Sequence, residues 1–169
     1  MAEYIFGIDI GGTTVKIGLF REEELIRKWE IPTRTEESGS LILKDIARAI
    51  EEELKSRELT ADDVSGIGVG VPGPVLTGGT VNGCVNLGWG VLNAAQEMKE
   101  LTGVSRVRIG NDANVAALGE MWKGGAAGHT NVVMVTLGTG VGGGIIIGGK
   151  VVNGSFGAGN DTQPKFWCK

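Results

Sequence analysis

The segment FGIDIGGTTVKIGLF, residues 6–20, joins two short apolar runs through a Gly-Gly-Thr-Thr turn. This pattern predicts a β-hairpin with strands over Tyr4–Asp9 and Val15–Phe20. Successive backbone N–H groups in such a turn form a concavity that binds phosphate, and glycine allows the ligand to approach the main chain closely. The hydroxyl groups of Thr13 and Thr14 would add donors. The turn is therefore a candidate phosphate-binding loop, although a plain hairpin turn remains the alternative.

One carboxylate, Asp9, stands directly before this turn. It is not expected to contact phosphate itself, because like charges repel. A phosphate-bound Mg2+ ion, held directly or through water, is a more reasonable partner for it. Lys16, on the second strand, would add positive charge. If the turn does not bind phosphate, Asp9 is simply a solvent-facing side chain.

Length and composition indicate an ordinary globular chain. Its 169 residues suit one domain, or one domain and a fragment of another. The formal net charge of -4 argues against nucleic-acid binding, which needs a basic surface. No apolar run is long enough to span a bilayer, and the amino terminus lacks the features of a signal peptide. We therefore expect a cytoplasmic protein with no membrane or nucleic-acid partner.

Cysteine and histidine are too scarce for several kinds of site. Cys84 and Cys168 cannot supply a disulfide framework or a structural zinc site. His129, the only histidine, lies in a glycine-rich connection, which argues against a Ser-His-Asp triad. Carboxylates and backbone amides therefore remain as the candidate groups for catalysis and binding. The 30 glycines support this view, because they cluster between apolar runs, where they indicate turns and close backbone approaches.

After the hairpin, the pattern continues with a strand and a helix. Leu25–Pro32 predicts a third strand. Apolar residues that recur every four positions predict a helix over 41–57, with Ser40 as its N-cap. The acidic run at 51–53 would form a solvated face of this helix.

The rest of the chain alternates strands and helices. In order, the pattern predicts a strand at 66–75, a loop, a helix at 92–101, a strand at 106–110 and a helix with Asn111 or Asp112 at its N-cap. From residue 131 it predicts strand, glycine turn, strand, turn and strand. This order is typical of an α/β arrangement with a mixed sheet.

The segment TLGTGVGGG, residues 136–144, supplies a second Gly/Thr turn. Two such turns on either side of a connector at 124–130 indicate a nucleotide held between two lobes, although a glycine-rich hairpin is the alternative. We therefore expect an amino-terminal lobe over 1–127, the incomplete start of a second lobe over 128–159 and an atypical tail over 160–169.

Two matches to G-x-G-x-x-G, at 68–73 and 138–143, are not expected to bind a dinucleotide. That motif must follow a strand and open a helix. The first match runs into Pro72 and Pro74, and the second into the β-branched run 145–147. A P-loop motif is also absent from the sequence.

The segment GNDAN, residues 110–114, provides the candidate catalytic group. A carboxylate at a helix amino terminus is usually a cap, and this interpretation stays open for Asp112. Asn111 and Asn114, however, flank it with amides suited to sugar hydroxyls. Asp112 would then accept the proton of a substrate hydroxyl as its oxygen attacks a phosphoryl group.

Two loop residues are further candidate substrate contacts. They are Gly73 in VPGPV and Asn86 in VNLGW. Turn chemistry around the prolines, and a side chain–backbone hydrogen bond for Asn86, would also account for them.

Five segments together resemble the ROK family of sugar kinases and, within it, the bacterial glucokinases. They are DIGGTTVKIGLF, GVGVPGPV, VNLGWG, GNDANVAALGEMWKGG and TLGTGVGGGIIIGGKVVNG, in the order and spacing of that family from about residue 4 to residue 159. The resemblance implies an actin-like (ribonuclease H-like) fold of two domains. It also implies transfer of the γ-phosphoryl group of ATP, with Mg2+, to the 6-hydroxyl of glucose.

The resemblance assigns roles by position. Asp112 would be the catalytic base, and Asn86 and Asn111 would hold sugar hydroxyls. The first phosphate loop would comprise Asp9, Gly11, Gly12, Thr13, Thr14 and Lys16, and the second Gly138, Thr139 and Gly140.

The chain departs from the family after residue 159. Family members continue with a Glu-x-Gly-His segment that touches the sugar, a cysteine-rich zinc motif and an adenosine-binding region, whereas here NDTQPKFWCK follows. We therefore expect a truncated or frameshifted reading frame, no structural zinc and impaired activity. A homodimer would belong to the full-length form.

Alternatives within the family stay open. The sugar could be another hexose or N-acetylmannosamine, and the chain could be a non-catalytic fragment or a regulator. ROK regulators carry a helix-turn-helix segment ahead of the first loop. Here Asp9 stands too close to Met1 for such a segment, which favours a kinase.

Overall fold

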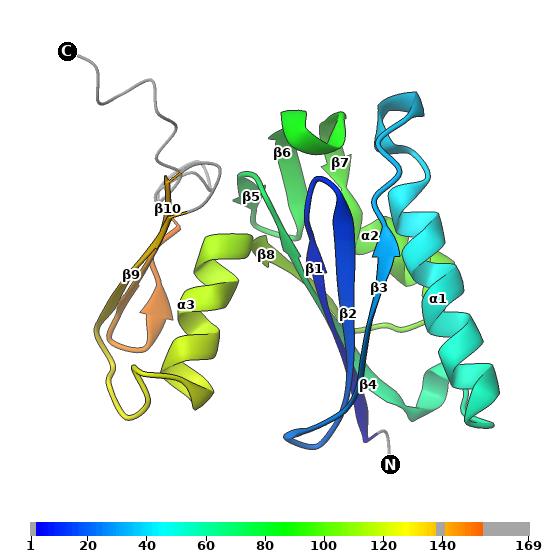
Figure 1. The fold of residues 1–169 in the computed structure, drawn as a ribbon, viewed down its shortest axis with the longest axis horizontal. Coiled ribbons are helices and arrows are strands. Elements are labelled where there is room, and N and C mark those ends of the chain that lie inside the picture. Colours follow the sequence, from blue (N-terminus) through cyan, green and yellow to red (C-terminus); the bar gives the residue numbers. More distant parts are fainter. Residues whose placement is uncertain (1–2, 138–140, 154–169) are drawn as a thin grey trace.

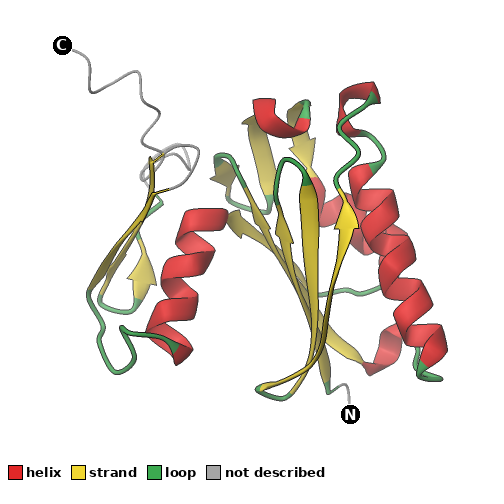
Figure 2. Cartoon of the chain, in the orientation of Figure 1, coloured by secondary structure: helices red, strands yellow, loops and turns green. Residues whose placement is uncertain are grey.

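The computed structural model describes residues 3–137 and 141–153, which form three helices of the α type and three β-sheets (Figures 1 and 2). The largest sheet has five strands in the order β3-β2-β1-β4-β8. β1, β2 and β3 pair antiparallel, whereas β4 pairs parallel with both β1 and β8, so the predicted mixed α/β sheet is confirmed. The strand bounds are β1 Tyr4–Ile10, β2 Thr14–Arg21, β3 Glu24–Pro32, β4 Val64–Val71 and β8 Val107–Asn111.

Two helices close one face of this sheet over the hydrophobic core. Because side chains alternate along a strand, Phe6, Ile8 and Ile10 of β1 point to the same face, where they are buried. The helices α1 (Ile42–Ser56) and α2 (Ala94–Thr102) lie together on that side in Figure 1. No helix in the described part of the chain has the length and apolar character that a bilayer crossing requires. The buried stripe of α1 contains Ile42, Leu43, Ile46, Ile50 and Leu54.

Ser40 is not the N-cap of α1, contrary to the sequence prediction. The cap position is Leu41, which makes no side-chain cap hydrogen bond. Ser40 has αR backbone angles, φ -63° and ψ -16°, and closes the short 3-10 turn η1 (Glu37–Gly39) by donating its N–H to the carbonyl of Glu37. Ser40 therefore belongs to the preceding turn, and Leu41 separates it from the first residue of α1.

A second sheet forms where the sequence predicts a loop. Its strands β5 (Val75–Leu76), β6 (Thr80–Cys84) and β7 (Trp89–Asn93) pair antiparallel. Positive φ angles of 87° at Gly78 and 83° at Gly79 form the tight turn between β5 and β6. The strands are short, so the alternation of apolar and polar residues did not reveal them.

The helix α2 starts later than the sequence predicts. Leu92 pairs with Val81, so it belongs to a strand rather than to the helix. Asn93 then caps α2, because its Oδ1 accepts a hydrogen bond of 3.0 Å from the N–H of Gln96. The apolar residues before Asn93 are therefore part of the second sheet.

The third sheet contains β9 (Val132–Leu137), β10 (Val141–Ile147) and β11 (Lys150–Val151) in the order β11-β10-β9. The predicted succession of strand, turn, strand, turn and strand agrees with it. The helix α3 (Asp112–Lys123) packs between this sheet and the main sheet, as Figure 1 shows. The division of the chain near residue 128 stays a prediction.

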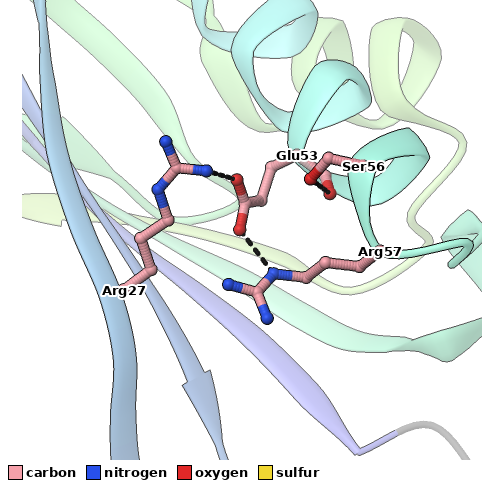
Figure 3. Close-up of polar contacts among 4 residues, drawn as sticks. All are labelled: Arg27, Glu53, Ser56 and Arg57. Carbon is pink, nitrogen blue, oxygen red and sulfur yellow. Dashed lines mark hydrogen bonds and ion pairs between the residues drawn. The ribbon is translucent and has the colours of Figure 1, made fainter.

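Glu53 on α1 is buried, although the sequence places the acidic run of this helix on a solvated face. Its carboxylate is 3% exposed and forms ion pairs with Arg27 of β3 and with Arg57 (Figure 3). Nε of Arg57 lies 2.5 Å from one carboxylate oxygen, and Arg27 binds the other. A buried carboxylate costs much solvation energy unless it is paired and hydrogen-bonded. Helical periodicity did not reveal this arrangement, because Arg27 comes from a strand.

Replacing both arginines, Arg27→Met with Arg57→Met, should lower the free energy of unfolding by about 3 kcal/mol or more, because the buried carboxylate loses its partners. Adding Glu53→Leu to this double variant should recover most of the loss, since no buried charge remains. Urea unfolding followed by circular dichroism measures both effects. Equal stability of the double variant and the unmodified chain would show that these ion pairs do not hold Glu53.

Candidate functional site

Two aspartates lie on either side of one glycine at the carboxyl ends of parallel strands. In the sheet register, Asp9 of β1 lies opposite Gly70 of β4, and Gly70 lies opposite Gly110 of β8. Asp112 follows shortly after as the first residue of α3. A Cβ added at Gly70 would lie 3.6 Å from Cα of Asp112 and 3.9 Å from Oδ1 of Asp9. The parallel pairing therefore brings the predicted catalytic base and the predicted metal-linked carboxylate into one small region.

The first Gly/Thr turn is anchored by Thr33, just after the end of β3. Oγ1 of Thr33 donates a hydrogen bond of 2.7 Å to the carbonyl of Gly11, and its N–H donates one of 2.9 Å to the carbonyl of Thr13. Within the turn, the N–H of Gly11 donates to the carbonyl of Thr14 at 3.0 Å. Gly12 and Thr13 are exposed. The turn is thus held in shape while its outer part faces solvent, as a phosphate-binding loop requires.

Sequence reasoning did not identify Thr33. The sequence shows only that a residue with a hydroxyl group follows the third strand directly. Its role becomes visible in the strand register, where Thr14 pairs with Pro32 and the next residue, Thr33, therefore lies beside the turn. Lys16, by contrast, was expected near the turn. It lies on β2 opposite Asp9 and is exposed.

Asn111, rather than Asp112, caps α3. Oδ1 of Asn111 accepts a hydrogen bond of 3.2 Å from the N–H of Asn114. Asp112 is the first helical residue, and its Oδ1 accepts a hydrogen bond of 2.7 Å from the N–H of Ala113. Of the two residues predicted as the N-cap, Asn111 is therefore confirmed and Asp112 is not. Its carboxylate instead occupies the end of the helix where the aligned peptide dipoles stabilise a negative charge.

The loop that contains Gly73 is held close to both α3 and β6. Nδ2 of Asn111 donates a hydrogen bond of 3.3 Å to the carbonyl of Gly73, and Sγ of Cys84 donates to the carbonyl of Pro72 at 3.0 Å. A Cβ at Gly73 would lie 3.1 Å from the carbonyl oxygen of Gly83, so a larger residue would displace this loop. Two of the predicted substrate contacts, Gly73 and Asn111, are therefore joined directly.

Asn86 and Asn114 occupy different surroundings. Asn86 is exposed in the turn η3 (Val85–Leu87), and a Cβ at Gly12 would lie 3.9 Å from its backbone carbonyl oxygen. The Asn86 segment thus lies beside the first Gly/Thr turn. Asn114 is buried, and its Nδ2 donates a hydrogen bond of 3.3 Å to Oδ1 of Asn153. Asn114 therefore links α3 to the end of the third sheet.

A cleft of about 810 Å³ opens along β8 and α3. Asn111, Asn114 and Asn153 line it together with the glycine turn at 78–79. The described residues that line this cleft include neither Asp9 nor Asp112. The cleft therefore lies beside the pair of aspartates and not over it.

The donor set beside the first turn suits one kind of metal site. In residues 3–137 and 141–153, no three His, Cys, Asp or Glu side chains come together as a metal site. Asp9 offers one exposed carboxylate next to the turn. This fits a Mg2+ ion that takes most of its ligands from phosphate oxygens and water, and it does not fit a cage built of protein ligands alone.

The predicted second phosphate loop, Gly138, Thr139 and Gly140, lies outside the described residues. The strands on either side of it, β9 and β10, pair antiparallel up to Leu137 and Val141. This pairing agrees with the predicted hairpin, and the role of the turn stays a prediction.

The main sheet is mixed and has the strand order of the actin-like (ribonuclease H-like) folds. The candidate carboxylates lie at the ends of β1 and β8, which both pair in parallel with β4. The family model described as the ROK family matches residues 5–161. A glucokinase from Halalkalibacterium halodurans is 43% identical over 150 residues, which cover 88% of this chain and 45% of that protein. An N-acetyl-D-glucosamine kinase from Yersinia enterocolitica is 36% identical over 155 residues, which cover 88% and 48%.

Solved structures agree with this assignment. The ROK family glucokinase from Streptomyces griseus in complex with glucose and AMPPNP has a TM-score of 0.76 and 34% identity, covering 93% of this chain and 48% of that chain. The predicted actin-like fold is confirmed. The chain belongs to the ROK family. It spans about half the length of the curated relatives it matches.

Thr33→Val removes the hydroxyl that holds the first turn while keeping the shape of the side chain. We expect the free energy of unfolding to fall by about 1 kcal/mol, because the carbonyl of Gly11 loses its partner. Amide hydrogen exchange at Gly12 and Thr13 should become faster. Thr33→Ser keeps the hydroxyl and should behave like the unmodified chain. Unchanged exchange in Thr33→Val would show that the turn does not depend on this hydrogen bond.

Proposed function

We propose that this chain is the amino-terminal part of an ATP-dependent sugar kinase that transfers the γ-phosphoryl group of ATP to the 6-hydroxyl of glucose. The observation that carries the proposal is the position of Asp112, at the amino end of α3 and across Gly70 from Asp9. The relatives support it, because one is named glucokinase and the structure from S. griseus holds glucose together with AMPPNP, an ATP analogue.

Asp112 would act as the general base. Its carboxylate would accept the proton of the sugar hydroxyl while the hydroxyl oxygen attacks the γ-phosphorus. Asn111 holds the Gly73 loop against α3 and keeps further capacity for sugar hydroxyls, because an amide has two N–H donors and an oxygen with two lone pairs. Asn86, in its exposed turn, would supply a further contact with the sugar.

The first turn would hold the phosphates. The exposed backbone of Gly12 and Thr13 would donate to phosphate oxygens, and Lys16 would add positive charge. Asp9 would hold Mg2+ through its carboxylate or through a bound water. When bound, Mg2+ neutralises charge on the β- and γ-phosphates. From the second lobe, the contacts would come from Gly138, Thr139 and Gly140.

Phosphoryl transfer depends on positioning and on exclusion of water, which closure of two lobes provides. The chain alone is therefore expected to show little or no turnover with glucose and Mg-ATP in a coupled assay of ADP release. A completed version joins residues 1–153 to the part of the H. halodurans glucokinase that follows the matched region. It should turn over at roughly 1–100 per second. Comparable turnover by the chain alone would show that the added part is dispensable.

In the completed version, Asp112→Asn should lower kcat by about 10²–10⁴-fold, because the amide cannot accept the hydroxyl proton. The affinity for nucleotide should change little, since the first turn is untouched. Asp62→Asn, in the exposed turn η2 (Ala61–Asp63), is the matched control and should leave kcat unchanged. Steady-state kinetics and titration calorimetry measure the two quantities. A variant Asp112→Asn that keeps its kcat would remove this residue from the proposed mechanism.

N-acetylglucosamine is the second candidate substrate. The identity of 36% with an N-acetyl-D-glucosamine kinase favours it, and this sugar differs from glucose in its 2-acetamido group. Residues 1–153 can be joined to the carboxy-terminal part of either kinase, and kcat/KM can be measured for each fusion with both sugars. The comparison shows whether residues 1–153 influence the preference for one sugar over the other.

A further inference from the structure

The connection from β3 to α1, residues 33–41, contacts two loops of the candidate site. At its start, Thr33 donates two hydrogen bonds to carbonyls of the first Gly/Thr turn. Further along, the carbonyl of Gly39 accepts a hydrogen bond of 3.0 Å from Nε1 of Trp89. Trp89 is the first residue of β7 and comes shortly after the turn η3, which carries Asn86. One short segment therefore joins the predicted phosphate loop to the turn of a predicted sugar contact.

The turns η1 and η3 are packed closely against each other. A Cβ at Gly39 would lie only 2.1 Å from the carbonyl oxygen of Leu87, and a Cβ at Gly88 would lie 3.1 Å from Cα of Ser38. Both glycines have positive φ angles, of 67° and 73°, so a side chain there would also strain the backbone. Leu87 and Trp89 are buried at this contact. A buried indole N–H usually finds a hydrogen-bond partner, and here η1 supplies it.

The turn η1 keeps an unfavourable backbone conformation. Glu37, Ser38 and Gly39 have φ angles of 52°, 58° and 67°, and residues with a side chain rarely adopt such values. A conformation of this kind persists only where the surrounding contacts enforce it, and it is found preferentially at functional sites. Arg34 supplies a second anchor, because its guanidinium binds both carboxylate oxygens of Asp45 on α1. The connection is therefore held between α1 on one side and η3 on the other.

The turn η3 lies beside the first Gly/Thr turn. A Cβ at Gly12 would lie 3.9 Å from the backbone carbonyl oxygen of Asn86. Figure 1 shows the turn between β1 and β2, the turn between β6 and β7 and the connection before α1 at the same end of the molecule. Phosphoryl transfer requires the reacting groups in a defined relative position. A segment that holds both turns would therefore control the geometry on which the proposed reaction depends.

We propose that the connection 33–41 sets the position of Asn86 relative to the first Gly/Thr turn, with Gly39 and Trp89 as positioning residues for the sugar. The inference rests on the proposed function, in which Asn86 contacts the sugar and the first turn contacts phosphate. Gly39 and Trp89 act through Asn86 and need not touch either substrate. Loss of the indole N–H releases η3 from η1, and the side chain of Asn86 then no longer meets the sugar at a fixed place. The first turn keeps its own anchor, Thr33, so nucleotide binding stays unchanged.

The first test uses this chain with Trp89→Phe, which keeps a buried aromatic ring and removes the N–H donor. The amide of Gly88, which is hydrogen-bonded within η3, should exchange its hydrogen about tenfold faster or more, because local opening becomes easier. The amide of Gly11, which closes the first turn, should keep its rate. Trp29→Phe on β3 is the matched control and should leave both rates unchanged.

An unchanged rate at Gly88 in Trp89→Phe would overturn the proposal. Faster exchange throughout the main sheet would indicate a general loss of stability, and would overturn it as well. If Trp89→Phe does not fold, benzothienylalanine incorporated at position 89 replaces it. This amino acid keeps the size of the indole ring and carries sulfur in place of the N–H group.

The second test uses the completed version. Trp89→Phe should raise KM for glucose by about fivefold to tenfold, as the loss of one hydrogen bond does, with little change in KM for ATP. In an Asn86→Ala background the same substitution should change KM for glucose by less than about twofold, because a residue that acts through Asn86 has no effect without that side chain.

An unchanged KM for glucose, or effects of equal size in the two backgrounds, would overturn the proposal. If the completed version has no activity with glucose, the proposed function fails. Exchange at Gly88 still decides in that case whether the connection holds η3, so the two failures are distinguishable.

Discussion

The candidate site depends on the parallel pairing of β4 with both β1 and β8. This pairing sets Asp9, Gly70 and Gly110 in one row, and Asp112 follows at the start of α3. Gly70 lies between the two aspartates, since a Cβ there would be in van der Waals contact with both, 3.6 Å from Cα of Asp112 and 3.9 Å from Oδ1 of Asp9. A β-branched residue would place more atoms in the same space.

Hydrogen bonds from residues around the site hold its loops. Thr33 holds the first turn, and Asn111 and Cys84 hold the loop of Gly73. Each such bond contributes only about 1 kcal/mol to stability, so its main effect is to limit the conformations of a loop. That effect would matter for the proposed phosphoryl transfer, because catalysis of this reaction consists mainly of positioning and electrostatic stabilisation.

The two faces of the main sheet are covered differently. One face is closed by α1 and α2 over fully buried side chains such as Phe6 and Ile17, which gives this part of the chain a core of its own. Glu53, bound by Arg27 and Arg57, adds a polar link between α1 and β3 on that side. On the other face, Gly7 pairs with Gly18 and with Gly68, and the side chain of Phe20 lies close to the first two of these glycines.

The sequence by itself determined the first hairpin and the mixed α/β order, because turn chemistry and periodicity act over a few neighbouring residues. The family followed from the resemblance of five segments, in their order and spacing, to the ROK sugar kinases. Only the tertiary structure decided between Asn111 and Asp112 as the cap of α3, because the pairing of β8 with β4 keeps Asn111 extended. It also decided that Glu53 is buried, that residues 75–93 form a second sheet and that Thr33 supports the first turn. Each of these features depends on contacts between segments far apart in the chain, which local patterns do not record.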